Sequence, residues 1–471
     1  MLTLADVFEA LTNTRPAQAN TVITEAAVDS RQAIPGSLFV ALPGEHMDGH
    51  DFVGDAFQHG ASFALIQHEV GTDQRTLDLR GNPSPLNSDQ SAAPLCLLVK
   101  DTLAALQQIA RFWRSKLNLR VVGITGSVGK STTKEVIAEV LSQRYHTLKS
   151  PGNMNNEIGL PLTILKLGSG YERAVLEMGF YVPGEIALLC EIAQPQIGVV
   201  TNIGTVHAER AGSQEAIFRG KSELVQSLPA EGAAILNLDD AWVAKMANLT
   251  EARVFFYGLD PQADLWADEV EGLGLEGIRF RLHYGHEVLH VRVPMIGQHS
   301  VHTALRAAAV GLVDGLTWQE ILDGLRQGHM QLRLAAVRSE SGALLLDDTY
   351  NASPESMLAA LNLLAELDGR KVAVLGDMLE LGPYEKQGHE VVGVRAAQVA
   401  DLLVTVGVLG HLIAEAARQA GLRSEKVTEC KDTGEAVAHL QKSLTDQDVV
   451  LVKGSHGIHM DRIVAALEVE S

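Results

Sequence analysis

The residues most suited to chemistry lie at positions 121–136, which read VVGITGSVGKSTTKEV. An apolar run, two glycines and a Gly-Lys-Ser triplet, followed by apolar residues at helical spacing, are typical of a strand, a phosphate-binding loop and a helix. Gly126 and Gly129 would let backbone N–H groups at the helix N-terminus face an anion. Lys130 would then reach the β- and γ-phosphates of a nucleotide, and the Ser131 hydroxyl would ligate Mg²⁺. The residues expected to surround the phosphates are Thr125, Gly126, Ser127, Gly129, Lys130, Ser131 and Thr132.

This loop departs from the common phosphate-loop pattern in one respect. That pattern has a glycine five residues before Gly129, where this chain has Ile124, and the glycine instead lies at position 126. The alternative to a nucleotide site is a glycine-rich turn that only joins a strand to a helix. The strand-loop-helix context favours the nucleotide site.

Polar residues also follow other apolar runs of the chain, at Glu177, Asn202, Asp348, Asp377 and Lys453. In open parallel sheets the ligand crevice lies at the carboxyl ends of the strands. Two sheets with such ends predict a site in the cleft between two domains. Two of these positions also have a simpler interpretation: Glu177 could be a solvated strand end, and the Asp347–Asp348 pair a turn or a Mg²⁺ site.

The order of the apolar runs predicts an α/β fold with three domains. We expect a small α/β N-terminal domain at residues 1–99, a central parallel-sheet domain with the phosphate loop at residues 100–327, and a C-terminal Rossmann-like α/β domain at residues 328–471. Residues 80–94, rich in Pro, Asn and Ser, predict a loop. The alternating pattern of residues 263–294 predicts an antiparallel excursion inside the central domain.

Composition limits the partners and the compartment. The 471 residues carry a formal net charge of −20 and no run of Lys and Arg, which argues against a nucleic-acid partner. No segment has the ~18 consecutive apolar residues of a membrane helix, and Asp6 and Glu9 lie where a signal peptide would be basic and then apolar. Cys96, Cys190 and Cys430 have no metal-type spacing. We therefore expect a cytoplasmic protein with reduced thiols and no membrane insertion.

Several longer segments resemble the Mur ligase family over essentially the whole chain. The phosphate loop has the form T-G-S-x-G-K-S that this family uses. The segment VDSRQAIPGSLFVALPGEHMDGHDF resembles the family's uridine-nucleotide-binding domain, and SPGNMNNEIGLPLTIL its N-x-N-N-x-I-G-x-P segment. LEMG, TNIGTVHAER and KSEL follow in the expected order. LLLDDTYNASPESM and VLGDMLELG are similar to the branch of the family that adds D-alanyl-D-alanine.

The resemblance implies an ATP-dependent amide ligase with Mg²⁺ as cofactor. The γ-phosphoryl group of ATP would activate a carboxylate as an acyl phosphate, which an amine then attacks. The implied catalytic residues are Lys130, His207 and Lys221. Ser131 and Glu177 would hold one Mg²⁺, His207 would help to hold a second, and Lys221 would be a further Mg²⁺ ligand. For Lys221 to bind the metal, CO₂ would have to carbamylate it, which requires a depressed pKa. Otherwise His207 is a structural histidine and Lys221 a surface lysine.

Other ligand contacts come from the resemblance alone. Arg333 would contact the ATP phosphates, Asp348 the ribose, and Tyr350 and Asn351 the base and sugar. The implied substrates are UDP-N-acetylmuramoyl-tripeptide and D-alanyl-D-alanine, bound by a monomer. Their candidate contacts are Ser30 and Arg31 for the uridine diphosphate, Asn153, Asn155 and Asn156 for the muramoyl peptide, and Asp377, Glu380 and His389 for the dipeptide. Asparagine clusters are otherwise usually turns.

The chain departs from the family at two places. Family members commonly read G-x-H-N-x-x-N where this chain has GQHSVHT, so Ser300 and Thr303 replace asparagines, the first of which contacts adenine. His456 replaces the arginine of K-G-S-R. The spacings His299/His302 and His456/His459 do not indicate zinc, because no cysteine lies nearby. The alternatives to D-alanyl-D-alanine addition are another Mur-type ligase, either third-residue-adding or folylpolyglutamate-like, and a non-catalytic nucleotide-binding homologue.

Overall fold

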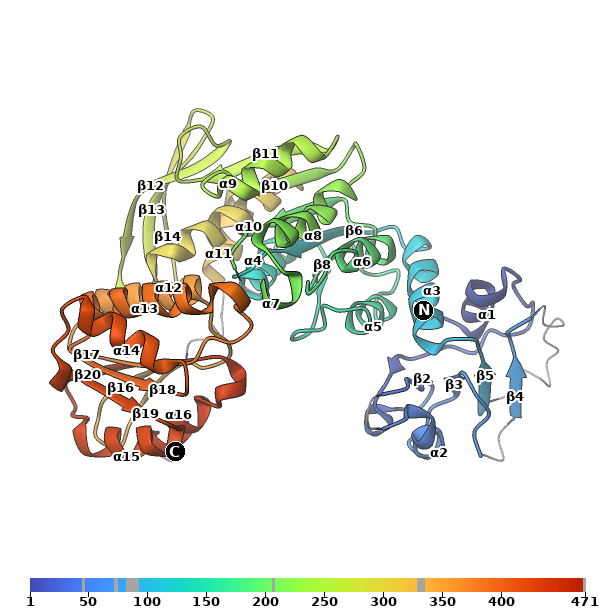
Figure 1. Cartoon of the computed structure of the whole chain (residues 1–471). Coiled ribbons are helices and arrows are strands. Elements are labelled where there is room, and N and C mark those ends of the chain that lie inside the picture. The colour runs from blue at the N-terminus through green and yellow to red at the C-terminus, as the bar shows by residue number, and fades with distance from the viewer. Residues whose placement is uncertain (45–46, 72–74, 82–92, 206–207, 328–334, 469–471) are drawn as a thin grey trace.

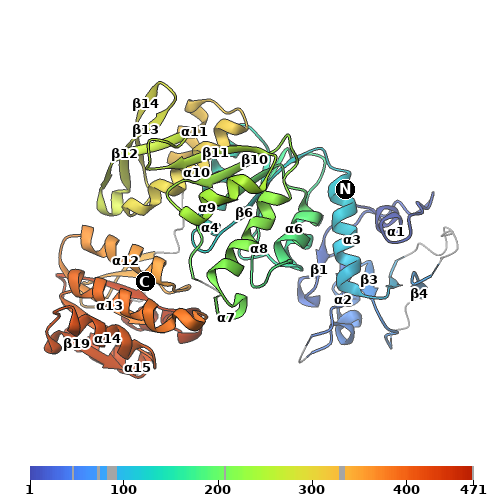
Figure 2. The ribbon, with the colours of Figure 1, turned by 45° about the horizontal axis from the view of Figure 1, so that its top comes forward.

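The computed structural model describes residues 1–471 except 45–46, 72–74, 82–92, 206–207, 328–334 and 469–471. Most of the predicted loop at residues 80–94 therefore lies outside the described residues. Figure 1 shows three lobes in chain order, with the N-terminal and C-terminal lobes on opposite sides of a central one. Figure 2 shows the same separation after rotation, with helix α3 (Thr102–Ser115) leading from the first lobe into the second.

The N-terminal lobe contains a five-stranded parallel sheet in the order β1-β2-β3-β5-β4. Its strands are β1 (Ala26–Ala27), β2 (Leu38–Val40), β3 (Phe63–Ile66), β4 (Arg75–Asp78) and β5 (Leu95–Leu98), and its helices are α1 (Leu4–Thr12) and α2 (Val53–Gln58). Helix α1 begins with a capping box in which Thr3 and Asp6 exchange side-chain and backbone hydrogen bonds. Its apolar face packs against α3 and the sheet.

The central lobe is built on a nine-stranded sheet in the order β14-β13-β12-β11-β10-β9-β6-β8-β7. The strands are β6 (Arg120–Thr125), β7 (Thr147–Lys149), β8 (Arg173–Glu177), β9 (Ile197–Val200), β10 (Ala233–Asn237), β11 (Arg253–Gly258), β12 (Leu265–Gly272), β13 (Ile278–Tyr284) and β14 (Glu287–Val293). In this order, the strands from β12 through β6 to β7 pair in parallel, whereas β13 pairs antiparallel with both β12 and β14. The antiparallel strands confirm the predicted antiparallel excursion.

Helices cover both faces of this sheet. They are α4 (Lys130–Ser142), α5 (Gly159–Leu165), α6 (Glu185–Ala193), α7 (Ala208–Ala211), α8 (Gln214–Gln226), α9 (Ala241–Lys245), α10 (Val301–Val313) and α11 (Trp318–Gln327). Helices α4 and α10 pack against each other over one apolar core, while α6 and α8 belong to the core of the other face. Strand β6 lies between β8 and β9, so the ends of these three strands meet at one point.

The C-terminal lobe has a six-stranded sheet in the order β15-β16-β20-β17-β18-β19, with only β15 antiparallel. Its strands are β15 (Ala335–Arg338), β16 (Leu344–Asp348), β17 (Arg370–Gly376), β18 (Leu402–Val406), β19 (Val427–Cys430) and β20 (Asp448–Lys453), and its helices are α12 (Pro354–Glu366), α13 (Glu385–Val399), α14 (Gly410–Gln419), α15 (Thr433–Ser443) and α16 (Asp461–Leu467). The three-lobed α/β class is as predicted.

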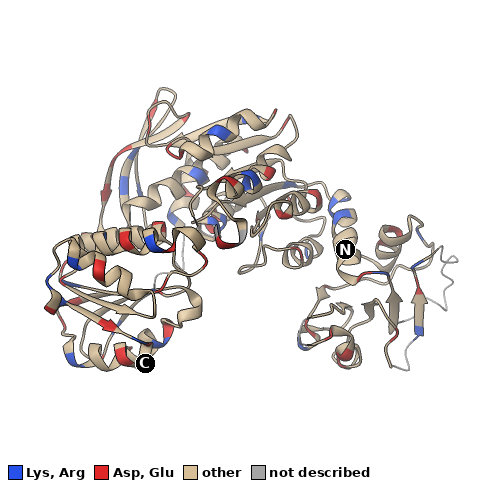
Figure 3. Ribbon diagram, viewed as in Figure 1, with Lys and Arg blue, Asp and Glu red and all other residues tan. Residues whose placement is uncertain are grey.

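Charge is mixed over the whole molecule. Figure 3 shows Lys and Arg as well as Asp and Glu scattered over all three lobes, despite the net charge of −20. Over the described part of the chain, no helix is both long and apolar enough to cross a membrane. The three cysteines are buried free thiols.

A buried ion-pair cluster ties β6 and β8 to the end of α10. Arg120 and Arg173 both donate to the carboxylate of Asp314, whose side chain is fully buried. The Arg173 guanidinium also lies 3.7 Å from the centre of the Tyr145 ring. Only the carboxylate is fully buried, since Arg120 is half-exposed, but removing it would take away the partner that both guanidinium groups share, which is more costly than losing an exposed pair.

We therefore expect Asp314→Ala to lower the free energy of unfolding by about 3 kcal/mol, measured by denaturant unfolding. The matched control is Glu271→Ala, which removes an exposed pair with Arg279 on the same sheet and should cost much less. Equal losses in the two variants would contradict the structural role of Asp314.

Candidate functional site

A cavity of about 590 Å³ lies between the central and C-terminal lobes. The phosphate loop, the ends of β8 and β9, and the start of α10 line it on one side. The ends of β16 and β20 and the face of α12 line it on the other. The predicted residues that it brings together are Ser127, Gly129, Lys130, Ser131, Thr132, Asn153, Asn155, Glu177, Asp348, Tyr350 and Asn351.

The end of β9 fixes the conformation of the phosphate loop. A side chain on Gly126, whose φ is +144°, would place its Cβ 1.8 Å from the Thr201 Oγ1 atom. That hydroxyl donates to the Val128 carbonyl at 2.7 Å, and the Asn202 Oδ1 atom accepts from the Val128 N–H at 2.9 Å. Thr125, the last residue of β6, is fully buried beneath the loop. The displaced glycine is therefore required where the loop touches β9.

Two ammonium groups converge on one carbonyl of this loop. Lys130, at the start of α4, and Lys221, in α8, each donate from Nζ to the Gly126 oxygen at 2.9 Å. Lys221 is 1% exposed, and its Nζ lies 4.8 Å from the centre of the Phe180 ring. Burial, reinforced by the charge of Lys130, holds the pKa of the Lys221 amine well below 10.5. The structure thus rejects the interpretation of Lys221 as a surface lysine.

Oxygen ligands suited to a hard divalent cation lie beside the loop. The Ser131 hydroxyl donates to Glu177 Oε2 at 2.7 Å, and the Asn155 amide donates to Glu177 Oε1 at 2.9 Å. Glu177 ends β8 and is 3% exposed. Hydroxyl, carboxylate and amide oxygens are the donors that Mg²⁺ prefers. The residues present therefore fit Mg²⁺, and Ser131 and Glu177 are the side chains that would hold it.

The C-terminal lobe contributes an ion pair and polar groups to the cavity. Lys453, at the end of β20, lies 2.7 Å from the Asp348 carboxylate and donates to the Asn351 carbonyl at 2.9 Å. Asp348 and Lys453 are paired at the ends of the neighbouring strands β16 and β20, which brings their side chains together. Tyr350 is 43% exposed beside them. Glu355, in the first turn of α12, accepts from the Thr205 N–H of the central lobe at 3.4 Å, which connects the two lobes.

Two buried cations at this site were not predicted from the sequence. Lys134 lies one turn after Lys130 in α4, is 1% exposed and approaches Glu177 to 3.8 Å. Arg306 lies one turn after Thr303 in α10 and lines the cavity. The i,i+4 and i,i+3 spacings could have pointed to both, because such residues share one helix face.

Some predicted contacts lie elsewhere. His207 and Arg333 fall outside the described residues. Ser30 is buried and Arg31 is largely exposed and paired with Asp29, all in the N-terminal lobe. Asn156 accepts from the Gly159 N–H at 2.8 Å, which gives it a turn role at the start of α5.

The three residues predicted for the dipeptide also have local contacts. Asp377 is buried and accepts from the Val408 and Leu409 N–H groups, each at 3.0 Å, and burial raises its pKa. Both ring nitrogens of the fully buried His389 bond to backbone atoms. Glu380 is half-buried, and its carbonyl accepts from the Glu209 N–H of the central lobe at 3.4 Å. Their role in binding the dipeptide stays a prediction.

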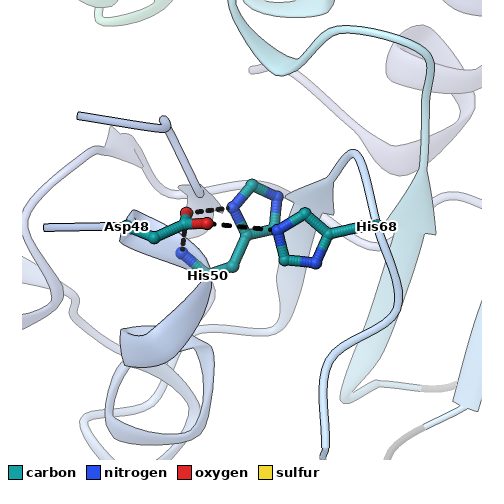
Figure 4. Close-up of side chains that lie close together, drawn as sticks. All are labelled: Asp48, His50 and His68. Carbon is teal, nitrogen blue, oxygen red and sulfur yellow. Dashed lines mark hydrogen bonds and ion pairs between the residues drawn. The ribbon is translucent and has the colours of Figure 1, made fainter. Parts of the chain in front are cut away.

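Among the described residues, Asp48, His50 and His68 form the one group of three or more His, Cys, Asp or Glu side chains that are close enough together to hold a metal ion (Figure 4). The Gln67 N–H donates to His50 Nε2 at 2.9 Å, so the His50 proton is on Nδ1, which faces Asp48 at 2.5 Å. Both nitrogens of His50 are therefore engaged. We interpret the cluster as a hydrogen-bonded brace at the end of β3, and the pairs His299/His302 and His456/His459 form no such cluster.

Comparison with known proteins places this geometry in a family. Residues 22–114, 124–311 and 332–456 match models described as the Mur ligase family catalytic domain, the Mur ligase middle domain and the Mur ligase glutamate ligase domain. The chain belongs to the Mur ligase family, whose members are ATP-dependent ligases that form carbon–nitrogen bonds.

Individual relatives match nearly the whole chain. A Bacillus subtilis protein named UDP-N-acetylmuramoyl-tripeptide–D-alanyl-D-alanine ligase is 35% identical over 458 residues, which cover 96% of this chain and 94% of that protein. A crystal structure of MurF from Acinetobacter baumannii has a TM-score of 0.83 at 31% identity and covers 98% of this chain and 97% of that one. MurF from Thermotoga maritima, solved with ADP, has a TM-score of 0.79 at 28% identity and covers 97% of each chain.

The contact between Gly126 and Thr201 predicts a strict requirement for glycine. Gly126→Ala should displace the phosphate loop and lower kcat/KM for ATP by about 100-fold or more, measured by steady-state kinetics. The control is Gly315→Ala, which also changes a glycine with positive φ (+82°) in the central lobe but has no atom within 4 Å of the new Cβ. A Gly126→Ala enzyme with the activity of the control would refute the close packing of this loop.

Proposed function

We propose that this chain joins D-alanyl-D-alanine to UDP-N-acetylmuramoyl-tripeptide in the cytoplasm, with ATP converted to ADP and phosphate. The observation that carries the proposal is the phosphate loop with its Ser131–Glu177 pair, facing Asp348 across a cavity between two lobes. The substrates come from the names of relatives that match more than nine-tenths of the chain. Those names favour this branch over third-residue-adding and folylpolyglutamate-like ligases.

The first half-reaction is a phosphoryl transfer between two anions. The peptide carboxylate attacks the γ-phosphorus of ATP, the bond from that phosphorus to the β-bridging oxygen breaks, and ADP leaves. Lys130 and the N–H groups at the start of α4 stabilise the charge on the phosphates. Mg²⁺, held by Ser131 and Glu177, would supply further positive charge when bound. His207 is proposed as a ligand of a second Mg²⁺.

The second half-reaction forms the amide. The free amine of D-alanyl-D-alanine attacks the acyl carbon, inorganic phosphate leaves, and the amine gives up its proton to solvent. No protein nucleophile is needed, so the enzyme contributes position and charge. Asn153 and Asn155 line the cavity next to Glu177, where the reacting end of the muramoyl peptide would lie. Ser30 and Arg31 are proposed to hold the uridine diphosphate at the far end of that peptide.

The nucleotide is proposed to bridge the two lobes. Its phosphates would lie on the loop of the central lobe, and its ribose and base would face Asp348, Tyr350 and Asn351 of the C-terminal lobe. Arg333 is also proposed to contact the phosphates. A monomer suffices for this arrangement, because all the proposed nucleotide contacts belong to the same chain.

Lys221 is proposed to carry a carbamate. Carbamylation adds CO₂ to a neutral amine and releases a proton, so it needs an amine whose pKa is depressed. Burial and the charge of Lys130 supply that depression. The resulting carboxylate-like group would bind Mg²⁺, and its negative charge would offset that of Lys130.

The ligase activity is tested by product formation and phosphate release. We expect both only when ATP, UDP-N-acetylmuramoyl-tripeptide and D-alanyl-D-alanine are all present, because the acyl phosphate needs the first two and the amide needs the third. ATP hydrolysis that is indifferent to the two acceptor substrates would rule out the proposed function.

The carbamate is tested with Lys221→Ala. This variant should lose about 100-fold or more of the activity, and acetate or formate should restore part of it by supplying the missing carboxylate. Lys245→Ala, which removes an exposed lysine on α9, should keep full activity. A Lys221→Ala enzyme as active as the Lys245→Ala control would contradict the proposal.

Activity of the unmodified enzyme should depend on pH and CO₂ in a defined direction. Because only the neutral amine reacts, the carbamylated fraction should rise as pH rises through the folded pKa of Lys221, which lies well below 10.5. Added bicarbonate should therefore restore activity to enzyme stripped of CO₂, and the restoration should be greater on the alkaline side of that pKa. Activity independent of bicarbonate at every pH would count against the carbamate.

A further inference from the structure

Arg306 is a buried cation in an otherwise small and apolar stretch of α10. It is 5% exposed, and its neighbours Ala304, Leu305 and Ala307 are fully buried. Its Nη2 donates to the Thr303 hydroxyl at 2.8 Å, and its Nε has no hydrogen-bond partner. The arginine therefore carries donors that the protein does not use.

The charge of Arg306 is also uncompensated. In the part of the chain that the structure describes, no carboxylate lies within ion-pair distance of this guanidinium. Its other close neighbour is Tyr257, whose ring centre lies 5.8 Å from the guanidinium carbon. Burial raises the pKa of Tyr257 to about 12, so the phenol is neutral. A guanidinium stays protonated in proteins, and burying one without a counterion is costly. This position therefore favours an anionic ligand.

The location of the guanidinium identifies the anion. Arg306 lines the same cavity as the phosphate loop, and its Nη2 would lie 3.6 Å from a Cβ built on Gly129, the residue just before α4. Lys130 stands at the start of the same helix. A helix N-terminus with two cations beside it attracts phosphate groups. The anion that fits this position is the phosphate chain of a nucleotide held by the phosphate loop.

The neighbouring residues offer little for recognition of the base. Ser300 and Thr303 occupy the positions of the family's two asparagines, and neither has a side-chain amide. The Ser300 hydroxyl donates to the Ile296 carbonyl at 2.7 Å, and the Thr303 oxygen accepts from Arg306. An amide can donate to and accept from one adenine edge at the same time, whereas these hydroxyls already have protein partners. Affinity lost at the base must be supplied by another contact.

We propose that Arg306 is a nucleotide-binding residue whose guanidinium contacts the phosphate chain of ATP and supplies affinity that the missing amides at positions 300 and 303 do not. The inference rests on the proposed use of ATP by this site. A purely structural role would instead use the bond to Thr303 and the contact with Tyr257 alone. The two roles differ in what they predict for ligands that lack phosphate.

The test compares Arg306→Met with the unchanged full-length chain in calorimetric titrations of ADP and adenosine. Methionine keeps most of the side-chain length but has neither charge nor donors. We expect the Kd of ADP to rise about 10- to 100-fold, because hydrogen bonds to charged groups are lost, and the Kd of adenosine to change less than about threefold. Unchanged ADP binding would overturn the proposal, and so would equal weakening of ADP and adenosine.

Folding of the variant is followed by its unfolding temperature without nucleotide. Replacing an unpaired buried charge by an apolar side chain of similar size is often neutral or stabilising, so we expect no decrease for Arg306→Met. A large decrease together with unchanged ADP binding would show a structural role and overturn the inference. Arg306→Lys keeps the charge and should recover part of the ADP affinity, which guards against a misfolded methionine variant.

The matched control is Arg326→Met, which replaces an exposed arginine on α11 of the same lobe and should leave both titrations unchanged. In kinetic assays Arg306→Met should raise KM for ATP more than it lowers kcat. The titrations contain no acceptor substrate. They therefore test Arg306 even if the ligated dipeptide is not D-alanyl-D-alanine, so failure of the inference and failure of the proposed function are distinguishable.

Discussion

The site depends on a concentration of positive charge around the phosphate loop. Lys130 and Lys221 share the Gly126 carbonyl oxygen, and Arg306 lies beside Gly129. Glu177 is the carboxylate that bonds to Ser131 beside them. Although the chain has a net charge of −20, these side chains are positioned by local packing and hydrogen bonds, and the net charge of the chain does not place them. A bound polyphosphate relieves the repulsion between the charges of Lys130 and Arg306, so ligand binding and local stability are coupled.

The sheet order makes this concentration possible. Strand β6 lies between β8 and β9, so the phosphate loop leaves the sheet between Glu177 on one side and Thr201 on the other. Thr201 leaves no room for a side chain at position 126, and Glu177 bonds to Ser131. Both constraints act on the backbone of one short loop. The loop is therefore shaped before the nucleotide arrives, which spares the cost of ordering it on binding.

Local patterns in the sequence predicted the α/β class, the phosphate loop and the Glu177 strand end, because these features depend on neighbouring residues. Helical spacing places Lys134 and Arg306 on the same faces as Lys130 and Thr303, but it does not show that they are buried, because their burial comes from segments far along the chain. Asp377 shows the opposite case. It follows an apolar strand as Glu177 does. However, a Cβ at position 407 would lie 2.5 Å from the Asp377 carboxylate, and because residue 407 is a glycine, the carboxylate fits there and accepts from the backbone N–H of Val408. Strand ends thus predict location but not side-chain direction.

The cavity lies between two lobes, so its affinity for a nucleotide depends on how these lobes are arranged. Asp348 is already neutralised by Lys453, and Glu355 reaches across to the Thr205 N–H. The C-terminal lobe therefore offers polar groups to the proposed nucleotide with no large excess of charge, whereas the loop side carries the cationic side chains of Lys130 and Arg306. Phosphate binding should depend mainly on the central lobe, and ribose and base binding on the approach of the C-terminal lobe. A nucleotide that touches both lobes favours the arrangement that brings them together. The size of this shift equals the difference between its binding free energies for the closed and the open arrangement.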